Sequence, residues 1–395
     1  MTTLPSPIEV TPPQPEATGL AARLRTTAPT VLSSLGAVAV ALLLGALIIA
    51  LSGDNAVAAY RALFAGAFGG VKPLAETLVA ATPLILGGLA FAVAFRAGMF
   101  NIGIEGQMVL GGLTAGLIGA VDLGLPAIAH VPVALAAAAL AGGLWAGLAG
   151  VLKATTGAHE VITTIMLNYL AYRISTYLIG NEDLLGIVRP DLQATDPAQP
   201  EARLPNLVDG TRLHAGLLLA MLAAGVLWYA LFRTVWGYRL RTVGLSRGAA
   251  AYAGISWGRT IALAMLVSGA LGGLGGASEA LGLQGRFYSG NEASGYGFTA
   301  IAVGLVGRNH PLGVVLAGLL FGALSSGATQ MQNTAGTSKD LVEVLIALVI
   351  LSVAAFAAAD RFLPRRRAAG SRAGTRAADV EIEPERGAGA APPAI

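Results

Sequence analysis

Polar side chains interrupt one of the most apolar parts of the sequence at RAGMFNIGIEGQ, which runs from Arg96 to Gln107. Asn101 and Glu105 lie in its centre, and Gln107 ends it. A buried amide or carboxylate costs free energy unless a ligand, an ion or a structural bond requires it. These residue types can bind a small polar solute, and the carboxylate can carry a proton. The segment is therefore the first candidate for a functional site.

Two interpretations of this segment are open. Gly103 and Gly106 would let the backbone break, leaving the end of a half-helix beside a solute pathway. Alternatively, the segment is a re-entrant turn in which Glu105 pairs with Arg96 and Asn101 caps the next helix. The residues do not decide between these for Glu105, and Asn101 is the better candidate for contact with a solute.

A second polar group lies in EVITTIMLNY, which begins at Glu160. At helical spacing, Thr163, Thr164 and Asn168 share one face or adjacent faces. Hydrogen bonding between helices explains threonines in a membrane helix without any substrate. Asn168 lies a turn deeper and is the better pathway candidate.

A third group lies in SGYGFTA, residues 294–300. Tyr296, Phe298 and Thr299 could present an aromatic face to a flat polar ligand. Aromatic residues at a membrane boundary are, however, often interfacial anchors, and we favour that interpretation for Tyr296.

The composition places these groups in a membrane protein. Of 395 residues, 55% are hydrophobic and 12% are charged, against about 25% charged in soluble domains. The net charge of +3 is not gathered into a basic patch, so we exclude nucleic acid as a partner. Cysteine is absent, which excludes disulfides and thiolate chemistry within this sequence.

Hydropathy predicts an all-α integral membrane protein with about ten transmembrane helices. The third and eighth candidates are short, as expected of discontinuous helices that line a cavity. Five crossings per half would make any internal repeat inverted in the membrane. The candidate spans are 30–52, 77–95, 106–121, 131–152, 161–180, 215–232, 260–278, 294–307, 311–329 and 341–359.

Lys and Arg residues predict the orientation, because they are about twice as frequent on the side of the N-terminus. Both termini are therefore expected in the cytoplasm. Residues 1–29 and 364–395 are predicted to be disordered cytoplasmic tails around a transmembrane domain at 30–363. Two connections are long: an outer loop at about 181–213, called the long loop below, and a cytoplasmic one at 233–259, called the basic loop. We expect the basic loop to form one or two short helices broken at glycine.

Chemistry that a membrane pump would need is missing from the sequence. Lys72, Lys153 and Lys339 are the three lysines, and none is followed by Ser or Thr as in a phosphate-cradling loop. His159 and Glu160 do not form a zinc-protease motif, because Thr163 occupies the second histidine position. We therefore expect no metal, no cofactor and no catalysis in this chain.

Four ordered segments resemble the membrane subunits of bacterial ABC importers, in the branched-chain amino acid, ribose and simple-sugar permease family. The nucleoside-uptake branch is the most similar, and the likeness extends over residues 75–330. The segments are FRAGMFNIGIEGQ (95–107), EVITTIMLNYLAY (160–172), GLSRGAAAYAGIS (244–256) and GYGFTAIAVGLVGRNHPLG (295–313).

This resemblance implies a translocation pathway between two permease subunits, often different chains, in the bacterial inner or plasma membrane. Cytoplasmic ATPase subunits would bind ATP, and an external lipoprotein would deliver the substrate. The basic loop would hold a coupling helix for the ATPase, although Gly248 stands where relatives usually carry Glu. The matching coupling positions are Gly244, Leu245, Ala249, Ala250, Tyr252, Gly254 and Ile255, and the matching pathway positions are Asn101, Glu105, Gln107, Asn168, Phe298 and Thr299.

The substrate implied by the resemblance is a nucleoside. A neutral nucleoside needs stacking and amide hydrogen bonds, which Phe298, Asn101 and Asn168 could supply. Simple sugars and branched-chain amino acids are the alternatives. A function of another class is also open, a stand-alone ion-coupled transporter with Glu105 or Glu279 as proton carrier. A membrane scaffold that transports nothing is a third possibility.

Overall fold

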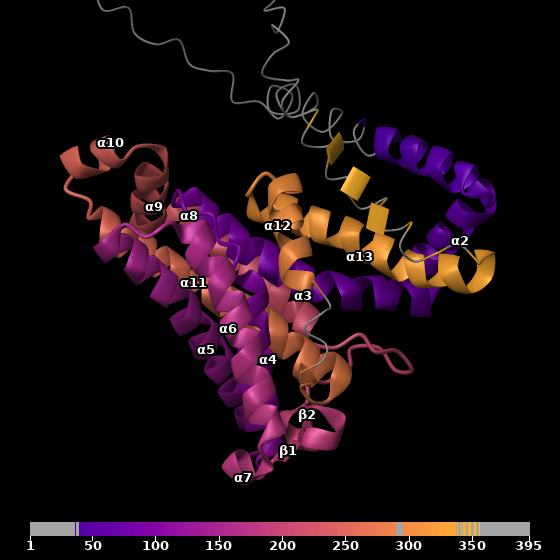
Figure 1. The fold of residues 1–395 in the computed structure, drawn as a ribbon, viewed down its shortest axis with the longest axis horizontal. Coiled ribbons are helices and arrows are strands. Elements are labelled where there is room, and N and C mark those ends of the chain that lie inside the picture. Colours follow the sequence, from indigo (N-terminus) through magenta and orange to yellow (C-terminus); the bar gives the residue numbers. More distant parts are fainter. Residues whose placement is uncertain are drawn as a thin grey trace, which may run out of the picture.

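The computed structural model describes residues 39–289 and 295–336, together with isolated residues at 36 and between 338 and 355. The described chain is almost entirely helical (Figure 1). Its helices are, in chain order, Ala39–Leu51, α2 (Ala56–Phe68), α3 (Val71–Arg96), α4 (Ile104–Ala120), α5 (Ala127–Thr156), α6 (Glu160–Gly180), α7 (Glu182–Leu185), α8 (Gly216–Arg233), α9 (Val235–Leu245), α10 (Arg247–Tyr252), α11 (Trp257–Ser278), α12 (Tyr296–Val306) and α13 (Pro311–Ala335).

Five of the described helices are long and apolar enough to cross a membrane: α3, α5, α8, α13 and α11, the last extended to Gln284 by the π-helical turn η3 (Glu279–Gln284). Ala39–Leu51, α2, α4 and α12 are shorter apolar helices. The prediction of a multi-pass helical membrane protein is confirmed. The expected tenth span at 341–359 lies largely outside the described residues, so the count of ten and the side of the termini remain predictions.

The short third and eighth helices are confirmed as α4 and α12. After α3, residues 97–103 form no helix; most of them are buried, and they run back into the bundle to Ser268 in the middle of α11. There α4 begins. α12 likewise begins inside the molecule, because the backbone of Gly297 contacts Glu105 in the first turn of α4. Two short helices thus start at one buried place.

Glycines let α11 pack directly on α4 and α5, which run beside it (Figure 1). A Cβ atom at Gly269 or Gly273 would overlap backbone of α5, and one at Gly276 would overlap the carbonyl of Met108 in α4. Small residues permit such close backbone contact in membranes. The glycine-rich stretch 269–276 of α11 is therefore a packing surface for α4 and α5.

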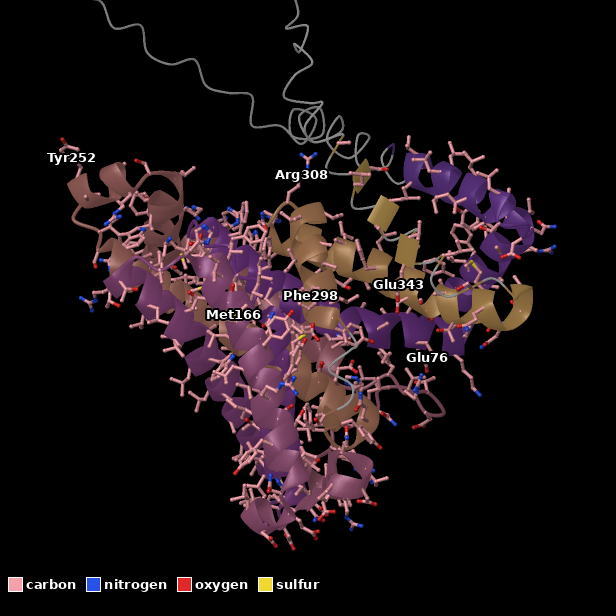
Figure 2. All side chains as sticks on the ribbon, viewed as in Figure 1. Glu76, Met166, Tyr252, Phe298, Arg308 and Glu343 are labelled. Carbon is pink, nitrogen blue, oxygen red and sulfur yellow. The ribbon has the colours of Figure 1, made fainter. Side chains whose placement is uncertain are left out.

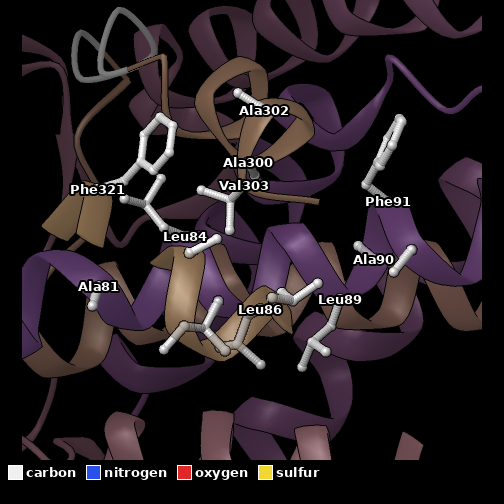
Figure 3. Packing of buried hydrophobic residues seen from close by; sticks show 14 of the residues in the cluster. Ala81, Leu84, Leu86, Leu89, Ala90, Phe91, Ala300, Ala302, Val303 and Phe321 are labelled. Atoms are coloured by element: carbon white, nitrogen blue, oxygen red, sulfur yellow. The ribbon is translucent and has the colours of Figure 1, made fainter. Parts of the chain in front are cut away.

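A second core joins α12 to α3 and α13 (Figure 3). Phe91 and Leu84 of α3 and Phe321 of α13 are buried beside Val303 and Ala300 of α12. In water, burial of each large side chain would be worth roughly 1.5–3 kcal/mol. In lipid that term is small, so close packing matters more. α12, with 11 residues, is held in place by this packing.

The two long connections lie at opposite ends of the bundle (Figure 1). The basic loop forms two short helices, α9 and α10, as expected, but the break between them lies at Ser246 and not at a glycine. The long loop contains α7, the antiparallel strands β1 (Val188–Arg189) and β2 (Ala194–Thr195), and two short 3-10 helices, η1 (Pro190–Leu192) and η2 (Pro200–Ala202). α2 was not predicted from hydropathy, although Asn55 caps its first turn with hydrogen bonds to Val57 and Ala58.

Candidate functional site

A network of buried amides holds the break before α4. The Asn101 Nδ2 donates to Gln107 Oε1 at 3.2 Å and to Ser268 Oγ at 2.9 Å, and Gln107 Nε2 donates to Asn101 Oδ1 at 3.1 Å. Asn101 Oδ1 also accepts from the Gly103 N–H at 2.9 Å. The hydroxyl of Ser268 donates onward to the Ala90 carbonyl at 2.7 Å. Non-helical backbone within a membrane needs such partners.

Asn168 of α6 also forms hydrogen bonds with the backbone around the start of α4. Its Oδ1 accepts from the Gly106 N–H at 2.9 Å, and its Nδ2 donates to the Ile102 carbonyl at 2.9 Å. Thr164 Oγ1 accepts from the Ile102 N–H at 3.3 Å. Thr164 therefore bonds the non-helical chain that leads into α4, and not another helix as we expected. Thr163 Oγ1 donates to the His159 carbonyl at the start of its own helix, at 3.1 Å.

Glu105 links the two short helices. Its Oε2 accepts a hydrogen bond from the Gly297 N–H at 2.6 Å, and its side chain is 2% exposed. This places a carboxylate at the N-terminus of α12, where unpaired backbone N–H groups and the helix dipole favour negative charge. Glycine is required at 297, because a Cβ there would overlap the backbone of Glu105.

Arg96 does not pair with Glu105. Its Nε donates to the Asn309 carbonyl at 2.5 Å, and its guanidinium lies 5.0 Å from the ring centre of Phe232. Nor does Asn101 cap α4, because the N-cap residue is Gly103 and it has no side-chain cap. The segment therefore forms a re-entrant turn, but the predicted Arg96–Glu105 pair and the predicted Asn101 cap are both wrong.

A cavity of about 280 Å³ opens beside Glu105, between α4, η3 and α12. This is near the lower end of the size range for small-molecule pockets, about 300–1,000 Å³. Acidic, amide and aromatic side chains line it together with apolar ones, a mixture suited to a small polar ligand with a flat ring. The polar and aromatic lining residues are Glu105, Glu279, Gln284, Phe287, Tyr288 and Tyr296.

The long loop builds one wall of this cavity. Thr195 of β2 bonds Phe287 twice, through its N–H to the Phe287 carbonyl at 2.9 Å and through its Oγ1, which accepts from the Phe287 N–H at 3.1 Å. Ala194 pairs with Tyr288 as an isolated bridge. Sequence reasoning missed Phe287, Tyr288 and Gln284, because nothing in their local pattern indicates that a distant loop holds them beside α4.

A second cavity, of about 370 Å³, adjoins the first, and Leu283 and Tyr296 line both. Glu76 and Arg212 form a bidentate ion pair at its edge, with N–O distances of 3.0 and 2.5 Å; Figure 2 shows Glu76 on α3. The hydrogen bonds that Arg212 donates to the Glu76 carboxylate raise the pKa of Arg212 above its usual value. The pair joins the long loop to the start of α3.

Phe298 and Thr299 do not line either cavity. Phe298 projects from the surface of α12 (Figure 2) and is 49% exposed, and Thr299 is half-buried. Tyr296, which we expected to anchor at the interface, instead lies between the two cavities.

The basic loop presents apolar and aromatic side chains to solvent. Leu245 is 88% exposed and Tyr252 is 99% exposed at the tip of α10 (Figure 2). Ala250 is fully buried, whereas a Cβ at Gly244 would overlap the Arg96 carbonyl at the end of α3. The other residues predicted for coupling are Ala249, whose N–H donates to the Ser246 Oγ at 3.2 Å, Gly254, which has a φ of 68°, and the half-buried Ile255.

The loop is thus seated directly on the end of α3 while its tip is free for a partner. Gly248 is exposed on α10, and a Cβ there would make an ordinary contact with Ser246. Nothing in the described structure explains glycine at this position.

Comparison with known proteins identifies similar chains. The family model described as branched-chain amino acid transport system, permease component, matches residues 74–354. The guanosine ABC transporter permease protein NupP of Bacillus subtilis is 42% identical over 80% of this chain and 91% of its own length. The nucleoside ABC transporter permease protein NupB of Lactococcus lactis is 35% identical over 86% and 94%.

A third similar protein, the glucose ABC transporter permease protein TsgB13 of Haloferax volcanii, is 39% identical over 81% of this chain and 85% of its own length. No solved structure matches this chain.

Proposed function

We propose that this chain carries nucleosides as the membrane subunit of an ABC importer. The chain belongs to the family of branched-chain amino acid transport system permease components. The substrate assignment rests on the sequence identity of 42% to a guanosine permease and of 35% to a nucleoside permease. The lining of the cavity beside Glu105 suits a nucleoside, because it combines aromatic rings with hydrogen-bond acceptors. A simple sugar is the second candidate, favoured by the 39% identity to a glucose permease.

The pathway we propose passes the place where α4 and α12 begin. Glu105 lines the cavity there, and Asn101, Gln107 and Asn168 hold the chain that leads into α4. Phe298 and Thr299 do not line the cavity, so we assign them to the side of the pathway that a second permease subunit would complete.

The partners we propose are an ATPase on the cytoplasmic side, a second permease subunit and a substrate-binding lipoprotein, in a bacterial inner or plasma membrane. ATP would bind to the ATPase and not to this chain. The exposed tip of α10 supports an ATPase contact at the basic loop. We retain ten spans, inverted halves and cytoplasmic termini as part of this proposal.

Reconstitution in proteoliposomes tests the class of transporter. The chain alone and the complete complex with its ATPase are given a radiolabelled nucleoside, with and without ATP and with and without a proton gradient. We expect uptake by the complex with ATP and none by the chain alone. Uptake by the chain alone that follows the proton gradient would show an ion-coupled transporter, and no uptake in any preparation would support a scaffold.

A competition panel tests the substrate. Unlabelled nucleosides, pentoses, hexoses and branched-chain amino acids are added to the complete complex during nucleoside uptake. We expect inhibition by nucleosides at the lowest concentrations. Inhibition by sugars or by amino acids alone would overturn the nucleoside assignment.

A further inference from the structure

Glu279 has a buried carboxylate oxygen to which no described residue donates a hydrogen bond. Its Oε1 has no partner among the residues that the structure describes. Such an atom is expensive, because an acceptor removed from water without a partner loses about 1–3 kcal/mol relative to one that is bonded. Buried polar groups without partners are rare, and a ligand or catalytic role is one of the usual reasons.

Arg212, the cation in electrostatic range, does not form a hydrogen bond with Glu279. Arg212 lies within electrostatic range of Glu279, but both of its bonded nitrogens are directed to Glu76 in the bidentate pair. No ion pair involving Glu279 is found in the described part of the chain. Glu279 is therefore not retained as half of a structural salt bridge.

Glu279 lies where α11 meets the cavity. It is the first residue of η3, where α11 changes to π-helical geometry, and it lines the 280 Å³ cavity with Glu105. Single π-helical turns within longer helices occur frequently at functional sites. The aromatic rings of Phe287, Tyr288 and Tyr296 line the same cavity.

We propose that Glu279 is a specificity-determining residue that accepts hydrogen bonds from the sugar hydroxyls of a nucleoside in this cavity, while the aromatic side chains accommodate the base. The inference rests on the proposed function. A carboxylate has two acceptor oxygens, which suits two neighbouring hydroxyl donors. A site built around a bonded hydroxyl rejects analogues that lack it, because its own polar group is then left unpaired.

Analogues without the hydroxyls provide the test. The complete complex, with its ATPase, partner permease and lipoprotein, is reconstituted with wild-type chain, Glu279→Gln or Glu279→Met. Uptake of a ribonucleoside is compared with uptake of its 2′,3′-dideoxy analogue. The same lipoprotein is used throughout, so its own preference contributes equally to every ratio. Glu182→Gln, at an exposed site in α7, is the matched control.

We expect the preference for the ribonucleoside to fall about tenfold in Glu279→Met, which has no oxygen acceptor, and by less in Glu279→Gln, which keeps one neutral acceptor. Glu182→Gln should keep the wild-type ratio. An unchanged ratio in both Glu279 variants would overturn the inference, as would an equal loss of uptake for both nucleosides. If Glu279→Met does not assemble, the ratio in Glu279→Gln decides alone.

Failure of the proposed function gives a different result. If wild-type complex takes up no nucleoside, then the substrate assignment is wrong, and Glu279 has no nucleoside to select. If wild-type complex takes up nucleosides and the ratio ignores Glu279, then the proposed function stands and this inference fails.

Discussion

Glu105 satisfies one of the backbone donors at the start of α12 and also places negative charge near the positive end of that helix. α12 has 11 residues, which is too short to be stable by its own hydrogen bonds. A carboxylate is tolerated in this apolar region because it accepts a hydrogen bond from a backbone N–H at the start of α12.

Replacing Glu105 should therefore destabilise the protein. In Glu105→Ala the Gly297 N–H loses its acceptor, and we expect a loss of about 1–3 kcal/mol in the free energy of unfolding. Glu105→Gln keeps an acceptor oxygen and should lose less. The thermal unfolding of purified protein in detergent measures both, with the exposed Asp122→Asn as control. Equal melting temperatures for all three would show that the bond contributes nothing.

His214 is the residue whose titration the fold affects most clearly outside the spans. Burial lowers the pKa of His214 from 6.5 to about 4. Its Nδ1 accepts from the Gly216 N–H at 3.2 Å, and its Nε2 has no partner among the described residues. The neutral ring is therefore the form that the fold accommodates.

The stability of the protein should decrease on acidification below pH 6.5. Because the folded pKa lies below the unfolded one, the unfolded chain binds the proton first, and stability is lost between pH 6.5 and 4. The full loss corresponds to roughly 3 kcal/mol. His214→Asn keeps an acceptor and should remove this part of the pH dependence, whereas the exposed His159→Asn should not. Unfolding at pH 7 and at pH 4.5 is compared, and identical pH dependence in both variants would contradict the assignment.

At the scale of the elements, α11 depends on its small residues. The backbones of α4 and α5 contact it at positions where a Cβ has no room. The row of small residues is visible in the sequence and is typical of close helix contact in a membrane. Which helices make the contact is decided by the tertiary structure, because the local pattern does not specify the partners.

Two glycine substitutions separate packing from helix propensity. Gly276→Ala would push the new methyl group into the Met108 carbonyl, and we expect a loss of about 1–3 kcal/mol or more. Gly225→Ala lies in the middle of α8, where nothing is within 4 Å of the new Cβ, and it should stabilise by up to about 1 kcal/mol. Chemical unfolding measures both, and equal effects would argue against the close packing of α11 on α4.

The tip of α10 carries the expected contact with the ATPase. Tyr252→Ala should weaken co-purification of the ATPase by about tenfold, since exposed tyrosines often dominate interfaces. Ala250→Asp should have a different effect, because Ala250 is buried and its replacement disturbs the loop itself. Tyr177→Ala on α6 is an exposed control. Unchanged ATPase binding by Tyr252→Ala would place the contact elsewhere.

At the scale of the whole molecule, the basic loop and the long loop lie at opposite ends of the bundle (Figure 1). The chain contains no cysteine, so single cysteines can report the side of each loop without background. We expect Tyr252→Cys to react with an impermeant thiol reagent only from the cytoplasmic side and Asp183→Cys, in α7, only from the outside. Labelling of both from one side would overturn the topology.

The sequence by itself determined the membrane class, the long apolar helices, the short α4 and α12, the two long connections and the family resemblance. These follow from the length of apolar runs and from local motifs, which need no knowledge of distant residues. The tertiary structure alone decided which polar groups meet. Glu105 finds its donor 192 positions away and Asn101 reaches Ser268 across 167, and no local pattern specifies such partners. The cavity exists because helix ends from distant parts of the chain converge there, and Glu279 at its lining has one oxygen without a hydrogen-bond partner among the described residues.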